Sequence, residues 1–303
     1  MPKSKFIFLF YFLFVVNNIH AQDSSLLKML NDSAAANAKT FYVAGTFKGN
    51  HFINMQTVES PAKGALSFII MHRFGELNSG AYNFFGLDNA TLRLGLDYGI
   101  TDRFAVGIGR SSLDKTFDGY LKYKLFLQTD GIAKMPVTID VLATISNYTQ
   151  QYADKPYLNA NYRTDYTTQL LIAKKFKQFS LQLTPTWLHF NLVPTSQDAN
   201  DLFALGVGAR VKLTHRMSII GEYNYLPTGQ VVSTPVYNSV SCAWEIETGG
   251  HVFQLVFSNS QGMTEPYYIA QTTGTWMKGD IYFGFNVSRN FNITKHAKLK
   301  LAN

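Results

Sequence analysis

Serine and histidine side chains are the first candidates for chemistry in this sequence, because together they form the nucleophile and general base of many hydrolases. His251 and Ser258 lie on one expected strand, seven residues apart. A strand rises about 3.4 Å per residue, so their Cα atoms would lie roughly 24 Å apart. The odd spacing also places the two side chains on opposite faces. We therefore expect no catalytic residues and rank a lipid-acting enzyme as the least favoured function.

Metal-ligating residues are scattered in the same way. His72, His189, His215 and His251 belong to separate expected strands, and no two of them have the spacing of ligands on one face. Cys242 is the single cysteine, so neither a disulfide within the chain nor a cysteine-based metal site is expected. The sequence therefore predicts no metal site and no cofactor.

Charged side chains recur at the inward-facing positions of many expected strands. Positive and negative positions nearly balance, whereas a pore that selects ions by charge carries an excess of one sign at its constriction. We therefore expect a narrow or largely occluded interior, filled by cross-strand ion pairs. A turn centred on Gly131 would place Lys122 opposite Asp140. The lumen charge candidates are Arg93, Asp97, Lys122, Lys124, Asp140, Arg210, Lys212, Glu222, Glu245 and Glu247.

A wall of strands must position these residues. Apolar residues alternate with polar or small ones from Leu92 to Tyr98 and from Phe203 to Leu213, as expected when one face meets lipid and the other a lumen. Gly206 and Gly208 occur in the second alternation, where glycine permits close packing or bending of the wall. The expected strands span 62–74, 88–100, 103–110, 119–127, 136–145, 162–175, 178–190, 201–214, 216–226, 241–248, 251–259 and 278–291.

The connections between these strands distinguish a membrane barrel from a secreted sandwich. Longer connections, such as 75–87 and 146–161, alternate with short ones, such as 101–102 and 249–250. Long loops and short turns emerge at opposite ends of an up-and-down barrel, whereas a Greek-key sandwich has no reason to keep that order. We predict an all-β, up-and-down antiparallel transmembrane β-barrel of about 12 strands. Its last strand would pair with its first, and both termini would lie at the periplasmic end.

The N-terminus has the order of a secretory signal peptide. Lys3 and Lys5 precede an apolar run too short to span a membrane, and cleavage is expected near Ala21. Aromatic residues make up 15% of the chain and charged residues only 16%, which favours an outer-membrane barrel with aromatic girdles. The formal charge of +7 is scattered without a basic block, so nucleic acid is not an expected partner.

The expected division of the chain has four parts. Residues 1–21 form the signal peptide and 22–60 a short helical or extended periplasmic segment, followed by the β-barrel over 61–291 and a tail over 292–303. The stretch 41–58 reads as extended. Three placements stay open for it: in the barrel wall, inside the barrel or below it.

Six short segments carry a family resemblance. They are GALSFIIMHRFG at 64–75, FGLD at 85–88, LDYGIT at 96–101, VGIGRS at 106–111, IETGGHVFQ at 246–254 and KGDIYFGFN at 278–286. These segments are similar to bacterial β-barrel proteins of the family called domain of unknown function 5777, common in Bacteroidota, and the resemblance runs from Leu26 to Phe291. It implies a barrel fold and an outer-membrane setting. It implies no established activity, ligand or catalytic residue.

Two classes of function stay open. The first is binding or passage of a small solute through a narrow, charge-balanced lumen, in contact with outer-membrane lipid. The second is a structural or interaction protein that docks a periplasmic protein partner through 22–60. Aromatic residues of the expected loops favour the first class, although the same residue types form interfacial girdles. They are Tyr82, Phe84, Phe85, Tyr267, Tyr268 and Trp276.

Overall fold

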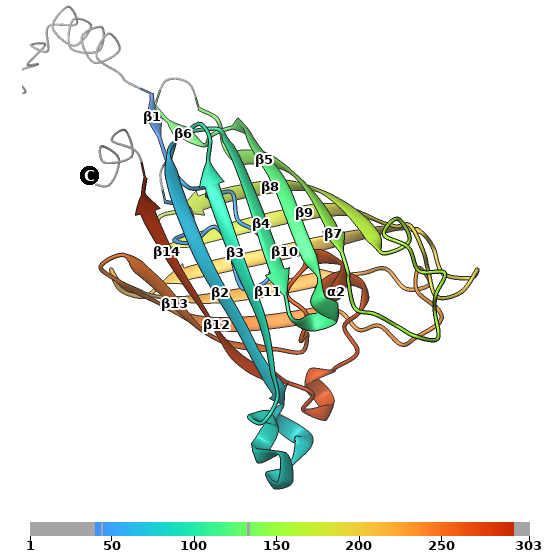
Figure 1. The fold of residues 1–303 in the computed structure, drawn as a ribbon. Coiled ribbons are helices and arrows are strands. Elements are labelled where there is room, and N and C mark those ends of the chain that lie inside the picture. The colour runs from blue at the N-terminus through green and yellow to red at the C-terminus, as the bar shows by residue number, and fades with distance from the viewer. Residues whose placement is uncertain (1–39, 44, 132–133, 294–303) are drawn as a thin grey trace, which may run out of the picture.

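The structure is a computed structural model that describes residues 40–43, 45–131 and 134–293. Twelve antiparallel strands close into one barrel (Figure 1). The wall consists of β2 (Ala65–Glu76), β3 (Ala90–Gly99), β4 (Phe104–Ser111), β5 (Phe117–Phe126), β7 (Thr138–Asn147), β8 (Thr164–Phe176), β9 (Phe179–Phe190), β10 (Asp201–Lys212), β11 (Met217–Tyr225), β12 (Ser239–Thr248), β13 (His251–Ser258) and β14 (Tyr282–Asn292).

The barrel closes between its last and first strands, as the sequence predicts. Strand β14 pairs with β2 along its length, so that Phe285 lies opposite His72 and Phe291 opposite Leu66. The backbone N–H of Ile293 donates to the carbonyl of Gly64 at 3.1 Å. This length is typical of such a hydrogen bond. The strand count, the antiparallel topology and the closing pair are therefore confirmed.

The two ends of the barrel carry different connections. One end, called the turn end below, has connections as short as 177–178 and 249–250, and both described ends of the chain lie there (Figure 1). The other end, called the loop end, carries the longer connections 77–89, 148–163, 191–200, 226–238 and 259–281.

The predicted alternation of long and short connections fails at one strand. The loop-end connection before β5 spans only 112–116, whereas the turn-end connection after β5 spans 127–137. The turn-end connection is longer because it contains β6 (Thr129–Asp130), which pairs with β1 (Phe41–Tyr42) outside the barrel wall.

This longer connection also changes the predicted register. Lys124, not Lys122, lies opposite Asp140, and Lys122 lies opposite Leu142. A bulge between Lys124 and Phe126 shifts the pairing by one residue, because an extra residue in one strand offsets its partner. The predicted pairing of Lys122 with Asp140 was therefore wrong.

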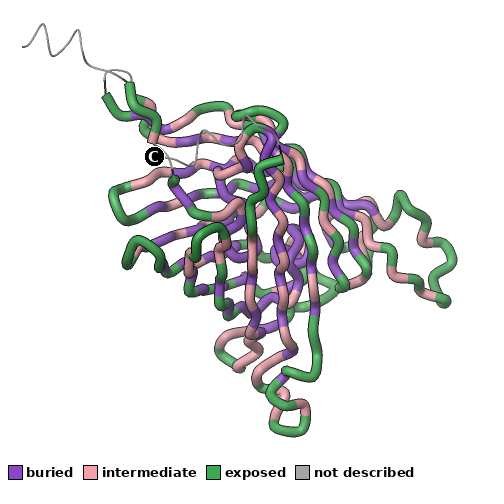
Figure 2. The backbone as a smooth tube through the Cα atoms, turned by 60° about the vertical axis from the view of Figure 1, so that its left-hand side comes forward, coloured by how far each residue is buried: buried purple, intermediate pink, exposed green. Residues whose placement is uncertain are grey.

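Side chains alternate between the lumen and the outer surface. Along β12, Ser239, Ser241, Ala243 and Glu245 are buried while the residues between them are exposed. The same alternation follows the other wall strands (Figure 2). Cys242 lies on the exposed face of β12.

The lumen is filled by two segments that are not part of the wall. Residues 46–47 and 51–58 are buried, including Phe52, Ile53 and Met55. Helix α2 (Glu265–Ala270) from the last loop is buried over all six of its residues. The stretch whose placement the sequence left open thus lies inside the barrel, and part of the expected periplasmic segment 22–60 with it. Residues 1–39, with the expected signal peptide and helical stretch, lie outside the described residues.

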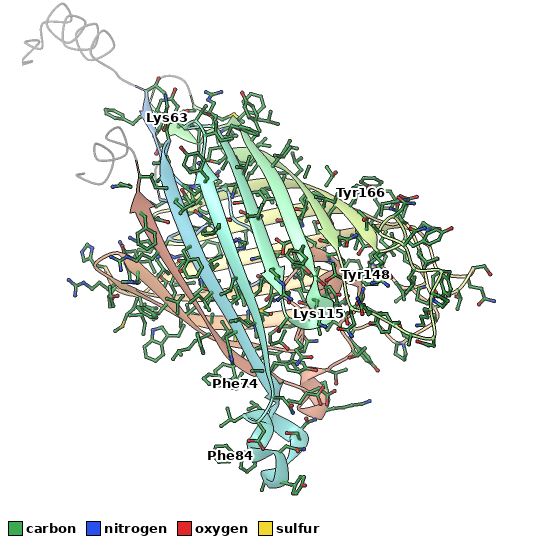
Figure 3. The ribbon with its side chains drawn as sticks, in the orientation of Figure 1. Lys63, Phe74, Phe84, Lys115, Tyr148 and Tyr166 are labelled. Atoms are coloured by element: carbon green, nitrogen blue, oxygen red, sulfur yellow. The ribbon has the colours of Figure 1, made fainter. Side chains whose placement is uncertain are left out.

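Helices are short in this fold. Within the described residues, no helix is both long and apolar enough to cross a membrane. The loop-end connection before β3 contains η1 (Leu77–Ser79) and η2 (Ala81–Gly86), which carry Phe84 beyond the barrel (Figure 3). Tyr82 is 97% exposed there. Two other short helices, η3 (Leu113–Lys115) and η4 (Trp276–Lys278), also lie in loop-end connections.

Candidate functional site: a plugged lumen below an outer cavity

Residues 46–60, called the plug below, form a tight loop inside the barrel. The backbone N–H of Phe52 donates to the carbonyl of Met55 at 2.8 Å, and that of Thr57 donates to the carbonyl of Asn50 at 2.8 Å. His51 and Gln56 form a bridge between the two arms. The plug therefore presents a turn at Ile53–Asn54 to the lumen wall, with its own backbone partly satisfied.

A single carboxylate on β11 binds this turn. The backbone N–H groups of Ile53, Asn54 and Met55 all donate to Oε2 of Glu222, at 3.1, 2.8 and 3.0 Å. Consecutive N–H groups that converge in this way form a concave anion site. Hydrogen bonds to a charged acceptor are stronger than neutral ones, so Glu222 is the strongest single anchor of the plug.

Amide side chains of the wall bind the arms of the plug. Oε1 of Gln182 accepts from the N–H of Val58 at 3.0 Å, and its Nε2 donates to the carbonyl of Gln56 at 2.8 Å. Across the lumen, Nδ2 of Asn286 donates to the carbonyl of Ile53 at 2.9 Å. These amide groups form hydrogen bonds with the backbone of the plug rather than with its side chains.

Cations of the wall bind the plug as well. Nζ of Lys122 donates to the carbonyl oxygens of Thr57 and Glu59, at 3.1 and 2.6 Å. Nη2 of Arg73 donates to Oδ1 of Asn54 at 3.0 Å. Both cationic side chains are completely buried. Removing a plug partner would leave a buried cation short of hydrogen bonds, which is costly.

Two glycines of β10 make room for the apolar side chains of the plug. A Cβ atom on Gly208 would lie 2.5 Å from the ring of Phe52, and one on Gly206 would lie 2.5 Å from Sδ of Met55. Both distances are far shorter than van der Waals contact. The close packing expected of these glycines is therefore packing of the wall against the plug.

Two further pairs of lumen charges lie within the wall, and Asp97 lies near the plug, whereas the carboxylate of Asp140 has no hydrogen-bond partner among the described residues. Arg93 and Asp118 form a buried ion pair, with Nε of Arg93 donating to Oδ1 at 3.0 Å. Arg210 pairs with Glu245 at 2.9 Å. Asp97 lies against the plug, where its Oδ2 accepts from Asn50 Nδ2 at 3.2 Å. Its Oδ2 also lies 3.7 Å from Nε2 of His51.

The candidate residues from the sequence thus occupy two zones. Arg93, Asp97, Lys122, Asp140, Arg210, Glu222 and Glu245 are buried in the lumen. Lys124, Lys212 and Glu247 are half-buried near the turn end. There Glu247 pairs with Lys48 of the plug arm at 2.6 Å.

Sequence reasoning missed four residues that hold this arrangement. Asp118 was not predicted because the expected strand began at residue 119. Asp118 shares the buried face of β5 with Tyr120 and Lys122. Arg73 faces the lumen on the same side of β2 as Met71. The period-two alternation of this strand was enough to predict that position. Gln182 and Asn286 carry no charge, so a search for charges passed over them.

Helix α2 closes the lumen on its loop-end side. Tyr268, Ile269 and Ala270 join the same apolar cluster as Phe52 and Met55 of the plug. Glu265, at the first turn of α2, is buried beside Asp118 and Arg93. The pKa of the Glu265 carboxyl is raised to about 7, mainly by burial and also by the nearby Asp118 carboxylate, while a backbone hydrogen bond and Arg93 oppose the rise.

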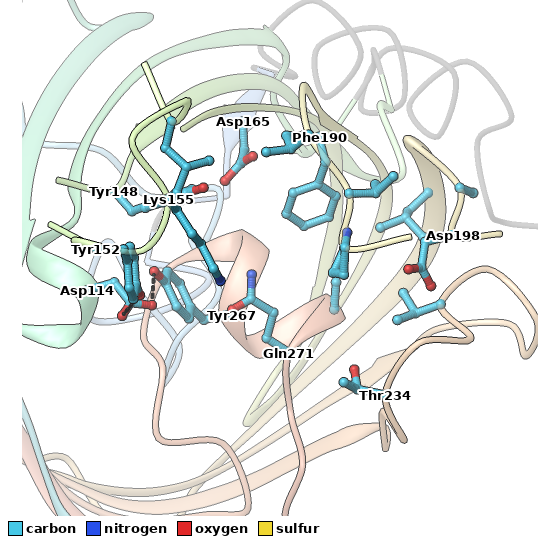
Figure 4. Close-up of a pocket in the computed structure, with 18 of the residues that line it drawn as sticks. Asp114, Tyr148, Tyr152, Lys155, Asp165, Phe190, Asp198, Thr234, Tyr267 and Gln271 are labelled. Atoms are coloured by element: carbon cyan, nitrogen blue, oxygen red, sulfur yellow. Dashed lines mark hydrogen bonds between the residues drawn. The ribbon is translucent and has the colours of Figure 1, made fainter. Parts of the chain in front are cut away.

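A cavity of about 670 Å³ lies above α2 at the loop end (Figure 4). Its wall combines tyrosines and aliphatic residues from four loop-end connections with one lysine and three carboxylates. The lining includes Asp114, Tyr148, Tyr152, Lys155, Asp165, Leu192, Asp198, Leu202, Tyr267, Ala270 and Gln271. A volume in this range suits a small organic ligand.

Hydrogen bonds fix part of the cavity wall. The hydroxyl of Tyr267 donates to Oδ2 of Asp114 at 2.8 Å, and that of Tyr152 donates to Oδ1 at 3.3 Å (Figure 4). On the opposite side, Oδ1 of Asp198 accepts from the N–H groups of Val232 and Ser233. These two backbone donors hold the pKa of Asp198 well below its usual range. Both clusters join separate loops, so the cavity shape is preorganised.

The aromatic loop residues expected from the sequence separate into two groups. Tyr267 and Tyr268 lie on α2, where Tyr267 lines the cavity and Tyr268 is fully buried beneath it. Tyr82, Phe84 and Phe85 lie on the projecting loop before β3 and do not line the cavity. In 40–43, 45–131 and 134–293, no group of three or more histidine, cysteine or acidic residues is placed to hold a metal ion.

Several solved outer-membrane proteins are similar to this chain at low sequence identity. The solved NanC porin has 7% identity and a TM-score of 0.46, covering 75% of this chain and 98% of that chain. An outer membrane channel from Pseudomonas putida F1 has 12% identity and a TM-score of 0.44, covering 81% of this chain and all of that chain. Omp33 of Acinetobacter baumannii has 7% identity and a TM-score of 0.41, covering 77% of this chain and all of that chain.

The family relationship rests on the sequence itself. No curated protein matches the chain. The model of the Membrane bound beta barrel domain (DUF5777) matches residues 47–291, which include nearly all of the plug and the whole barrel up to Phe291. The resemblance and the outer-membrane barrel expected from the sequence are thereby confirmed, and the chain belongs to the membrane-bound β-barrel domain family DUF5777.

Proposed function

We propose that this outer-membrane barrel binds a small solute in its loop-end cavity, and that the plug keeps the lumen closed until solute passes. The solute class that suits the cavity has an apolar ring and polar substituents. The observation that carries the proposal is the position of the cavity, directly above a lumen closed by α2 and the plug. In the expected orientation the loop end faces the cell exterior and the turn end the periplasm.

The chemistry of the cavity favours an amphipathic solute. Tyr148, Tyr152 and Tyr267 offer ring faces and hydroxyls, while Leu192 and Leu202 offer apolar surface. Ligand sites commonly combine an apolar lining with a few placed polar groups. Lys155 is the one cation among the lining residues, opposed by several carboxylates, so strongly anionic solutes are disfavoured.

The plug favours a gated barrel over an open pore. Its contacts combine a triply bound carboxylate, two buried cations and several amide hydrogen bonds. Each neutral hydrogen bond contributes about 1 kcal/mol net, and those to charged groups about twice as much. Passage along the lumen therefore requires the plug to leave, whereas binding in the cavity does not.

The competing proposal is docking of a periplasmic protein through the N-terminal segment. Residues 51–58 of the plug are enclosed by the wall, so a docking surface is left only to the residues before them. For catalysis, the described hydrogen bonds of His189 and His251 go to Asp201 and Arg289 rather than to a serine. We therefore propose a non-enzymatic protein.

The test of the proposed function is binding of phenyl β-D-glucoside, an uncharged probe with an aromatic ring and hydroxyls. Titration calorimetry on the full chain in lipid nanodiscs is expected to detect saturable binding. Thr273→Trp fills the cavity and is expected to abolish binding of the glucoside. Ser196→Trp is the matched control, because Ser196 is exposed in a neighbouring loop and does not line the cavity. Binding that survives Thr273→Trp, or no saturable binding at all, would contradict the proposal.

A further inference from the structure

The hydrogen-bonded ladder of the barrel wall is incomplete between the neighbouring strands β8 and β9. Pairing of these strands is interrupted between Gln169↔Thr186 and Ile172↔Leu183. Pro185 lies within this interruption, where it pairs with Leu205 of β10 on its other side. Proline has no backbone N–H, so it cannot complete the ladder toward β8.

This interruption differs from the other irregularities of the described wall. Those between β14 and β2 and between β5 and β7 are register shifts close to strand ends. The register on both sides of Pro185 is the same, so the strands stay aligned while the ladder between them lacks the hydrogen bond of one backbone N–H. In hydrocarbon no water replaces a missing ladder bond, which makes such a break costly inside a membrane wall.

A hollow of about 420 Å³ opens on the outer face at this break. Exposed Pro185, Trp187 and Phe203 border it, together with Thr168 and Leu170. Its inner margin is formed by the lumen-facing residues Gln169, Thr186 and Ala204, and its ninth lining residue is Val141. None of the nine lining residues is charged, so the hollow suits an uncharged, largely apolar molecule.

The hollow lies close to the loop-end cavity on the opposite face of the wall. Leu202 of β10 lines the cavity, and Ala204, two residues further along the same strand, lines the hollow. Two residues of a strand span about 7 Å. The inner face beside the break carries Leu171, Leu188 and Tyr268, all fully buried in one apolar cluster.

One hydrogen bond crosses the break from side chain to side chain. Nε2 of Gln169 donates to Oγ1 of Thr186 at 2.9 Å, at the end of the regular pairing. A side-chain bond of this kind is worth about as much as one backbone bond. It joins the strands at the last regular pair before the interruption, so its rupture would lengthen the stretch without bonds between β8 and β9.

From this geometry we propose that the break at Pro185 is a lateral portal between the loop-end cavity and the hydrocarbon of the surrounding leaflet. Small uncharged aromatic or apolar molecules pass through it. The proposal rests on the proposed function in one respect, because it takes the solute cavity as the inner end of the route. It explains how a barrel with a plugged lumen moves an apolar solute without displacing the plug.

The experiment closes the break with a disulfide. Leu170→Cys/Pro185→Cys, in a Cys242→Ser background, places two cysteines directly opposite each other across the break. Facing residues of antiparallel strands have Cα separations of about 4.5–5.5 Å, within disulfide range. The control is Leu96→Cys/Ile108→Cys, a regular outward-facing pair between β3 and β4. The probe is N-phenyl-1-naphthylamine, an apolar fluorophore that an intact lipopolysaccharide leaflet excludes.

Cells that produce the full chain are expected to take up the fluorophore faster than cells without it. Oxidation of the 170/185 pair is expected to reduce uptake to the rate of cells without the protein. Reduction is expected to restore uptake only in part, because Pro185→Cys itself restores a backbone N–H. Oxidation of the 96/108 pair is expected to change nothing. Pro185→Val restores an N–H without a disulfide and is expected to slow uptake about fivefold, the equivalent of one backbone hydrogen bond.

Uptake unchanged by both the disulfide and Pro185→Val would overturn the portal, as would wild-type uptake no faster than that of cells without the protein. The proposed function is judged separately by binding of phenyl β-D-glucoside. Retained glucoside binding with unaffected fluorophore uptake leaves solute binding intact and removes the portal alone. Loss of both signals removes both proposals.

Discussion

The plug and helix α2 close the same lumen with different chemistry. The plug is held by directional bonds from Glu222, Gln182 and Lys122 to its backbone. Helix α2 contributes mainly apolar contacts, with Tyr268, Ile269 and Ala270 packed in the shared cluster. Hydrogen bonds to backbone fix one register, whereas apolar packing tolerates adjustment. The plug is therefore the rigid closure, toward the turn end, and α2 is the adaptable closure, beneath the cavity.

The largest effect is expected from removing the carboxylate that binds the plug. Glu222→Leu leaves three N–H groups without their acceptor, and each such bond contributes about 2 kcal/mol. We expect the plug to leave the lumen, so that planar-bilayer recordings change from closed to open. Glu245→Gln is the matched control, because Glu245 pairs with Arg210 rather than with the plug. A closed Glu222→Leu barrel that remains heat-modifiable on gels would contradict the account.

A slightly smaller effect is expected from filling the space that the plug occupies. Gly208→Val would place side-chain atoms on the ring of Phe52, and such overpacking costs about 1–3 kcal/mol. We expect increased proteolysis of the plug and intermittent conductance. Adding Phe52→Ala is expected to restore closure. Gly221→Ala is a control, since a Cβ there meets nothing within 4 Å. Failure of Phe52→Ala to rescue would show that the two residues do not compete for space.

A pH effect distinguishes the α2 closure from the plug. The pKa of Glu265 is raised from its usual 4.5 to about 7, so the folded state holds the proton more tightly. Below pH 4.5 Glu265 is protonated, and burial of the neutral carboxyl costs little free energy. The stability of the α2 closure therefore falls as the pH rises from 4.5 through about 7. This pKa shift corresponds to a change of at most about 3 kcal/mol in the stability of the α2 closure.

Hydrogen exchange of the amides of α2 measures this effect after correction for intrinsic exchange rates. Protection is expected to be lower at pH 8 than at pH 5 in the wild type and equal in Glu265→Gln. The amides of Ile53, Asn54 and Met55 in the plug serve as the internal comparison. Equal protection of α2 at both values in the wild type would remove the distinction between the two closures.

The smallest effect is expected at the outer arm of the plug. The Lys48–Glu247 pair at 2.6 Å is about one-third exposed, with side-chain exposures of 33% and 36%. Exposed pairs contribute about 0.5 kcal/mol and are screened by salt. Lys48→Ala is therefore expected to leave the barrel closed and to change its thermal stability little. An open Lys48→Ala barrel would move the main anchor away from Glu222.

The barrel wall was largely predictable from the sequence. Alternation along segments such as 203–213 reflects the two-residue period of a strand, and short turns such as 249–250 fix which strands are neighbours. All twelve expected strands overlap the observed ones. The register of β5 against β7 was not predictable, because a bulge and the small β6 element depend on contacts with distant β1.

The interior was only partly predictable. Alternation identified Glu222 and Lys122 as lumen residues, and the near-balance of charge indicated an occluded barrel. Their partners could not be found in this way, because Glu222 binds backbone N–H groups of Ile53–Met55 and a backbone carries no sequence signal. The role of Gly208 required the position of Phe52, which comes from a segment more than 150 residues away.

Single-channel recording of the full chain in planar bilayers tests the central claim most directly. We expect the inserted wild-type barrel to stay closed at low voltage, because the plug and α2 fill the lumen from both ends. Brief openings at high voltage are compatible with displacement of the plug. A stable open pore of nanosiemens conductance in the wild type would contradict the account.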